Sequence, residues 1–143
     1  MNLQETYSYL RQIRKKEYAI RRKQLRCEEL RSCMGAGAIR YDKDCSRAAP
    51  SDKVSEIICK IVDLEGQIQR LKQEKALLII EIGDAIEQLP DDKEAMILTA
   101  YYIRRLTMEQ VAEEMDYSLQ YTYRLRKRGV QHISGIIGGF LDT

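Results

Sequence analysis

The sequence predicts an all-α fold, with a long antiparallel helical hairpin followed by a compact helix-turn-helix head. Three observations favour this fold. Charged residues make up 32% of the 143-residue chain, which has only eight glycines, two prolines and one phenylalanine; such a composition is typical of long solvated helices rather than of a large globular core. Apolar residues recur at steps of three and four in two long stretches. Near the C-terminus, two short helical patterns follow one another, each behind its own capping residue. We therefore expect a hairpin stalk over residues 1–89 and a head over residues 90–143.

The first element is an amphipathic helix over residues 3–34. Its apolar side is formed by Leu3, Tyr7, Leu10, Ile13, Ile20, Cys27, Leu30 and Met34. Basic residues outnumber acidic ones on the rest of its surface. This excess would suit an accessory phosphate-binding face, but charge runs on helices are usually only a solvated surface. We therefore favour the solvated outer face of a coiled coil.

A loop over about residues 35–52 follows, because Gly35, Gly37 and Pro50 interrupt the helical pattern. Ser51 is a candidate N-cap for the next helix. That helix carries a heptad seam with one polar interruption at Lys75, and the seam consists of Ile61, Leu64, Ile68, Leu71, Lys75, Leu78, Ile82, Ala85 and Leu89. The matched lengths of the two stretches favour an antiparallel hairpin. An isolated pair of helices buries little surface, so the stalk is also a candidate surface for homo-oligomer formation between copies of the chain.

The head begins where Pro90 ends the long helix and Asp91-Asp92 can cap the next. A helix around Ala95–Tyr102 is expected to pack across the helix-turn-helix pair. Thr107 and Gln110 have the spacing of a capping box, and the Asp116-Tyr117 pair marks the turn, since aspartate tolerates the left-handed conformation. Ser118 caps the last helix, whose inner side we expect to hold Leu119, Thr122, Leu125 and Gly129. Residues 133–141 continue this helix and fray at their glycines. We favour docking of their apolar side chains on the stalk over a contact with a partner.

The last helix is basic, and this favours binding to double-stranded DNA. It contains no acidic residue between Asp116 and Asp142, and its cations are Arg124, Arg126, Lys127 and Arg128. A helix with this composition suits a phosphate-walled groove, although a solvated basic helix end would also explain the pattern. Glutamine pairs with adenine and arginine with guanine, so Gln120 and Arg124 are the candidate base contacts. The candidate backbone contacts are Tyr121, Tyr123, Lys127 and Arg128, with His132 as a further candidate.

Composition argues against several other functions. The formal net charge is only +2, so a nucleic-acid surface has to be local. Four cysteines without CxxC spacing and a single histidine, His132, argue against a structural zinc site and a catalytic set. We find no phosphate loop or paired carboxylates and expect no enzyme activity, cofactor or metal. The start of the chain lacks the apolar core of a signal peptide, and the apolar clusters at residues 76–80 and 133–141 are too short to cross a bilayer. A cytoplasmic protein is expected.

The head resembles region 4 of bacterial sigma factors. The residues that carry the resemblance are Leu89-Pro90, Ile97-Leu98, Tyr101-Tyr102-Ile103, the run from Leu106 to Met115 and Ser118. In that family a similar Leu-Thr-x-x-Glu-Ile/Val-Ala run opens the first helix of the motif, and Ser or Thr caps the recognition helix. The whole chain resembles phage late-gene transcription activators of the ArpU/RinA type, which have a region-4-like head behind a predicted coiled-coil arm. Residues 51–54, 60–61 and 63–65 are similar to the second helix of that arm.

The resemblance implies a sequence-specific regulator in a bacterial host cell, with major-groove contacts at Leu119, Gln120, Tyr123 and Arg124 and with RNA polymerase as a further partner. Together with the contacts predicted from the helix itself, the full set of predicted DNA-binding residues is Ser118, Leu119, Gln120, Tyr121, Tyr123, Arg124, Lys127 and Arg128. Departures from the family pattern imply a site of its own, because region 4 usually has a basic residue where Leu119 stands and glycine where Asp116 stands. Where the family has Ala-Leu, the chain has Gly129-Val130, which would weaken the helix locally. Two other functions stay open: a phage DNA-packaging (small terminase) subunit, and an interaction adaptor whose head binds RNA polymerase or another protein.

Overall fold

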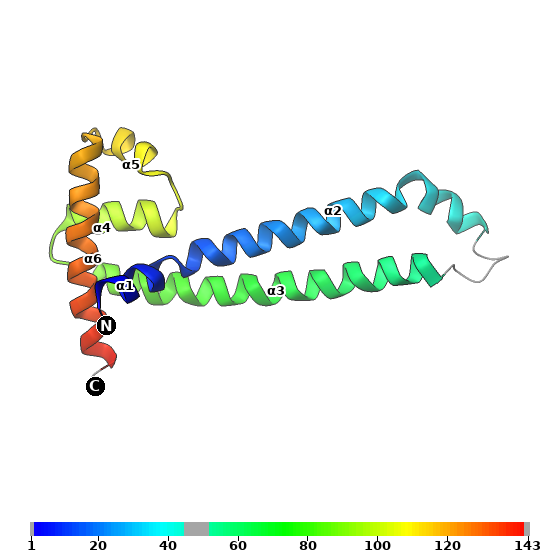
Figure 1. Ribbon diagram of the computed structural model, residues 1–143, viewed down its shortest axis with the longest axis horizontal. Coiled ribbons are helices and arrows are strands. Elements are labelled where there is room, and N and C mark those ends of the chain that lie inside the picture. Colours follow the sequence, from blue (N-terminus) through cyan, green and yellow to red (C-terminus); the bar gives the residue numbers. More distant parts are fainter. Residues whose placement is uncertain (1, 45–51, 142–143) are drawn as a thin grey trace. The chain divides into compact units, whose positions relative to one another are not determined.

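A computed structural model of the protein describes residues 2–44 and 52–141, with side chains for residues 2–34 and 52–138. All regular structure in these residues is helical, which confirms the predicted fold class. In chain order the elements are α1 (Leu3–Leu10), α2 (Gln12–Asp44), α3 (Asp52–Glu87), α4 (Asp92–Leu98), the π-helical turn η1 (Thr99–Ile103), α5 (Met108–Met115) and α6 (Leu119–Leu141) (Figure 1). None of the described helices is both long and apolar enough to cross a membrane.

The first helical stretch differs from the prediction in two places. It is interrupted at Arg11, whose N–H donates to the carbonyl groups of both Tyr7 and Tyr9. Beyond residue 34 the helix continues to Asp44, so the loop predicted from residue 35 was wrong in its start. Gly35 and Gly37 alternate with alanines, the best helix formers, and a glycine costs a helix only about 1 kcal/mol. The predicted cap Ser51 lies outside the described residues.

Contacts divide the chain into two units, which also differ from the predicted division at residue 89. The hairpin unit comprises Lys16–Glu74, and the head unit comprises Met1–Lys15 with Lys75–Thr143. The difference has a simple cause. The apolar side of α3 is continuous, as the seam predicted, but its first half packs on α2 and its second half packs in the core of the head unit.

In the hairpin unit, α2 and α3 run antiparallel. Two cross-helix pairs show the direction: Lys16 Nζ lies 2.8 Å from Glu74 Oε2, and Lys23 Nζ donates to Gln67 Oε1 at 2.8 Å. As residue numbers rise along α2, their partners in α3 fall. The apolar seam between the helices contains Ile20, Cys27, Leu64 and Ile68, all buried.

The main core of the head unit is built from segments far apart in the sequence. It joins α1 and the start of α2 to the end of α3, to α4 and η1, and to α6, and its largest buried side chains include Leu10, Ile13, Ile82, Ile86, Leu98, Tyr102 and Ile133. Ile133 and Ile137 are both buried there, so the C-terminal part of α6 packs in this core, where it contacts α1, a part of the predicted stalk. The expected fraying does not occur within the described residues, since α6 remains helical to Leu141.

Gly129 lies where α6 passes close to α4. A Cβ atom at this position would lie 3.0 Å from Leu98 Cδ1 and 3.4 Å from Glu94 Cβ. Leu98 is fully buried and has little room to move. The glycine that seemed only to weaken the helix therefore permits the two helices to pack.

Candidate nucleic-acid interface

The helix-turn-helix is formed by α5, the turn at Asp116 and the first half of α6, and its predicted caps are confirmed. Gln110 N–H donates to Thr107 Oγ1 at 3.1 Å, and Thr107 N–H donates to Gln110 Oε1 at 2.9 Å. Asp116 adopts the left-handed conformation, with φ 58° and ψ 44°. Tyr121 N–H donates to Ser118 Oγ at 3.1 Å. Short-range hydrogen bonds therefore fix the angle at which α6 leaves the turn.

A second apolar cluster holds this motif together. Ile97 from α4, Ala100 from η1, Val111 from α5 and Leu125 from α6 are buried against one another. Thr122 is also fully buried, and its hydroxyl donates to the Ser118 carbonyl at 2.8 Å. The first half of α6 is thus fixed from one side only, and its opposite side is left to solvent.

The solvent side of α6 carries most of the predicted DNA-binding residues. We call it the outer row, which follows the Ser118 cap and comprises Leu119, Gln120, Tyr123, Arg124, Lys127 and Arg128, all exposed. Alternating steps of one and three residues keep these side chains on one face of the helix. The row thus combines amide and guanidinium groups with two exposed large side chains, Leu119 (40% exposed) and Tyr123 (46%).

Two residues at the start of α6 differ in burial from the prediction. Leu119 was expected on the inner side but is exposed, so that part of the prediction was wrong. Tyr121, a predicted backbone contact, is instead half-buried and packs against the second cluster. Its ring meets Tyr117 edge to face, with centroids 5.0 Å apart. Tyr117 and Tyr121 both pack against the second cluster beside the turn.

Arg126, counted among the cations of the basic helix, is not part of the outer row and packs among tyrosine rings. Its guanidinium carbon lies 4.6 Å from the Tyr101 ring centroid and 5.5 Å from that of Tyr7. Two more rings, those of Tyr102 and Tyr123, lie at 5.9 Å. Burial raises the pKa of the Tyr102 hydroxyl, and the charge of Arg126 opposes that rise. The cation is thus held among aromatic rings in the head unit.

Arg14 reaches the same tyrosine from the other end of the sequence. Its Nη2 donates to the carbonyl oxygen of Tyr101 at 2.9 Å and to that of Leu106 at 3.4 Å, and its guanidinium carbon lies 4.6 Å from the Tyr101 ring centroid. These carbonyls flank the turn after η1, where Arg105 has a positive φ of 61°. Arg14 therefore donates to one backbone acceptor within η1 and to one in the turn that follows it.

Sequence reasoning missed these internal cations and one internal acid, Glu94. The Glu94 side chain is fully buried, with Oε2 2.8 Å from His132 Nδ1 and Oε1 3.7 Å from Arg128 Nε. The helical periodicity could have indicated that Glu94 and Arg126 lie at core positions. Glu94 precedes the buried Ile97 and Leu98 by three and four residues, and Arg126 lies four residues from Thr122 and from Val130. A polar residue at a core position usually has a partner.

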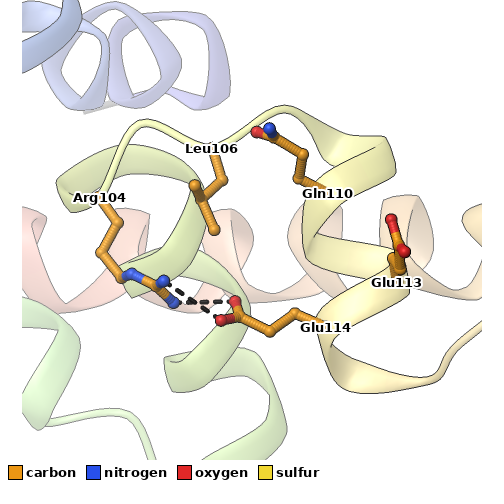
Figure 2. A pocket seen from close by; sticks show the side chains of 5 residues that line it. All are labelled: Arg104, Leu106, Gln110, Glu113 and Glu114. Atoms are coloured by element: carbon orange, nitrogen blue, oxygen red, sulfur yellow. Dashed lines mark hydrogen bonds and ion pairs between the residues drawn. The ribbon is translucent and has the colours of Figure 1, made fainter.

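The exposed side of α5 is acidic and differs from the outer row. A pocket of about 370 Å³ lies beside it, and Figure 2 shows the side chains of Arg104, Leu106, Gln110, Glu113 and Glu114 around it. Arg104 forms two hydrogen bonds with Glu114, at 2.8 and 3.2 Å, so its charge is neutralised. The carboxylates on this side of α5 would repel a phosphate. Among the residues that the structure describes, no group of three His, Cys, Asp or Glu side chains could hold a metal ion.

Comparison with known proteins agrees with this geometry. No curated protein and no solved structure gave a significant match. A family model does match, over residues 85–134, which is less than half of the chain, and its description is Sigma-70, region 4. The match begins near the end of α3 and ends within α6, so it covers α4, η1, α5 and the outer row. This part of the chain is therefore similar to a DNA-binding, non-enzymatic helix-turn-helix family.

Proposed function

We propose that the protein is a sequence-specific regulator of transcription that inserts α6 into the major groove of double-stranded DNA. The observation that carries the proposal is the outer row, which a region-4-like helix-turn-helix leaves exposed on one side of α6. Recognition helices of this class contact base edges with their N-terminal residues. Gln120 and Arg124 would contact bases, while Ser118, Tyr123, Lys127 and Arg128 would contact the sugar-phosphate backbone.

The salt dependence of DNA binding tests this proposal. With Arg126 held among tyrosines, the outer row contributes Arg124, Lys127 and Arg128. We expect log K to fall against log salt with a slope of about −3 per head, and about twice that for two heads on two half-sites. Fluorescence anisotropy with genomic fragments of the source organism, selected by repeated binding, measures the slope. A slope near zero would contradict DNA binding through α6.

Arg104→Gln is a suitable control in that titration. It removes a cation from the head unit, but one that is paired with Glu114 on the acidic side of α5. The slope should therefore stay at the wild-type value. A smaller slope for this variant would show that DNA meets the acidic side rather than the outer row.

We further propose that the protein self-associates through its hairpin unit. Among the described side chains of this unit, four large apolar ones are exposed: Tyr18, Leu25, Ile58 and Val62. Seam residues such as Leu71 pack in the chain's own core, so their replacement would test the hairpin itself. Val62→Glu should lower the sedimentation coefficient from that of a dimer to that of a monomer. Gln69→Glu, at another exposed position of α3, should leave it unchanged.

A wild-type protein that stays monomeric at high concentration would contradict self-association. A ring of many subunits would favour a DNA-packaging subunit.

The more specific role that we propose is activation of late genes by a phage or prophage protein in the bacterial cytoplasm, with RNA polymerase as the second partner. Two observations support this role: the stalk resembles the coiled-coil arm of ArpU/RinA-type activators, and the head matches the region-4 family model. An adaptor that binds only protein is the second candidate, because the acidic side of α5 is exposed and unsuited to DNA. Salt-insensitive pull-down of polymerase without DNA binding would favour the adaptor.

A further inference from the structure

Glu94 is a buried carboxylate directly beneath the outer row. It projects from the first turn of α4, and its fully buried side chain faces α6 beside Gly129. One carboxylate oxygen, Oε2, pairs with His132 Nδ1 at 2.8 Å. The other, Oε1, has no hydrogen-bond partner and lies 3.7 Å from Arg128 Nε. A buried carboxylate is costly unless cations or donors accompany it, so the arrangement ties Arg128 and His132 to one acid.

His132 continues the outer row by one more turn of the helix. It follows Arg128 by four residues and Arg124 by eight, and half of its side chain is exposed. Because Nδ1 faces Glu94, the other ring nitrogen, Nε2, is left for groups that approach from solvent. Glu94 from α4 and Arg128 from α6 are the charged groups that the structure places around this imidazole.

We propose that Glu94, Arg128 and His132 form a proton-coupled binding site for a DNA backbone phosphate; this inference rests on the proposed function. A neutral imidazole that donates Nδ1–H to Glu94 has only a lone pair on Nε2, and a lone pair repels a phosphate oxygen. A protonated imidazole donates from both nitrogens, to Glu94 on the inside and to the phosphate on the outside. The cluster then changes from neutral to a net single positive charge, so phosphate and proton bind together.

The sign of the pH dependence follows from this linkage. The phosphate stabilises the charged imidazolium, so proton uptake and phosphate binding favour each other, and the affinity for DNA should fall as the pH rises. The chain contains a single histidine. Each wild-type head should therefore take up no more than one proton when it binds DNA. Its affinity for DNA should be about three- to tenfold higher at pH 6 than at pH 8.

The experiment uses the full chain and a random-sequence duplex at constant ionic strength, because a phosphate contact carries no sequence information. Dissociation constants are measured by anisotropy at several pH values for wild type, His132→Gln, Glu94→Gln and Asp92→Asn. The histidine variant should lose the pH dependence, and the Glu94 variant should lose most of it. Asp92 is an exposed acid in the same turn of α4, so its variant should keep the wild-type profile.

The possible results separate the two proposals. Wild-type binding that depends on salt but not on pH would overturn the proton-coupled site and leave DNA binding intact. No binding at any pH would overturn both. A wild-type pH profile in His132→Gln would also overturn the site, and the same profile in Glu94→Gln would overturn the role of the carboxylate. If Glu94→Gln lowers the helical content in circular dichroism, the half-exposed His132 variant still decides the question.

Discussion

Replacement of Leu125 by alanine should lower the free energy of unfolding of the head unit by about 2–5 kcal/mol. The side chain is 1% exposed and joins α6 to Ile97 in α4 and to Val111 in α5. Its truncation would leave a cavity where three helices meet, and the caps of α5 and α6 cannot close it. Hydrogen exchange of the amides in α4, α5 and α6 measures the loss in the head unit alone.

Leu119→Ala provides the matched control, because the two leucines lie on the same helix. Leu119 is 40% exposed, and a surface substitution usually changes stability by less than about 0.5 kcal/mol. Hydrogen exchange should therefore remain at the wild-type level while affinity for the cognate site falls. Equal losses of protection in the two variants would show that Leu119 packs in the core, as the sequence pattern alone suggested.

Replacement of Arg124 by alanine should cost about 1–3 kcal/mol of binding free energy at the cognate site. An exposed arginine in the second turn of a recognition helix suits a guanine edge, and its loss should relax the preference at one base pair. Binding to random DNA should change less. Competition between cognate and random duplexes gives both affinities in one titration.

Lys127→Ala separates base recognition from backbone contact. Lys127 is also exposed on the outer row, one turn after Tyr123 and Arg124, and we expect it to meet a phosphate. Its removal should weaken cognate and random DNA by similar factors. If Arg124→Ala behaves in the same way, Arg124 does not contact a base, and α6 lies in the groove in another register or outside it.

Local features of the head were predictable because their partners lie nearby in the sequence. The Thr107–Gln110 box and the Ser118 cap are contacts over three residues, and the conformation of Asp116 follows from its side chain. The seam of α3 was predictable for a similar reason, since helical periodicity selects its buried side. These features place α5 and α6 correctly and expose the outer row.

Long-range contacts could not be predicted from a single sequence. Arg14 and Tyr101 are 87 residues apart, and no local rule distinguishes Arg14 from the solvated cations around it. Arg126 looks like its basic neighbours until four tyrosine rings surround it. The contact units differ from the predicted division at residue 89 for the same reason, because the seam of α3 has one pattern but two sets of partners. In each case the deciding partner is remote in the sequence.

The packing of α1 into the head has a consequence for folding during synthesis. Leu10 and Ile13 share their core with Ile133 and Ile137, so these two residues cannot complete their core until a segment far along the chain has been synthesised. The hairpin unit can form from sequential segments in the meantime. Contacts of such large sequence separation slow folding, and until α6 emerges the apolar side of α1 stays exposed to chaperones and to other nascent chains.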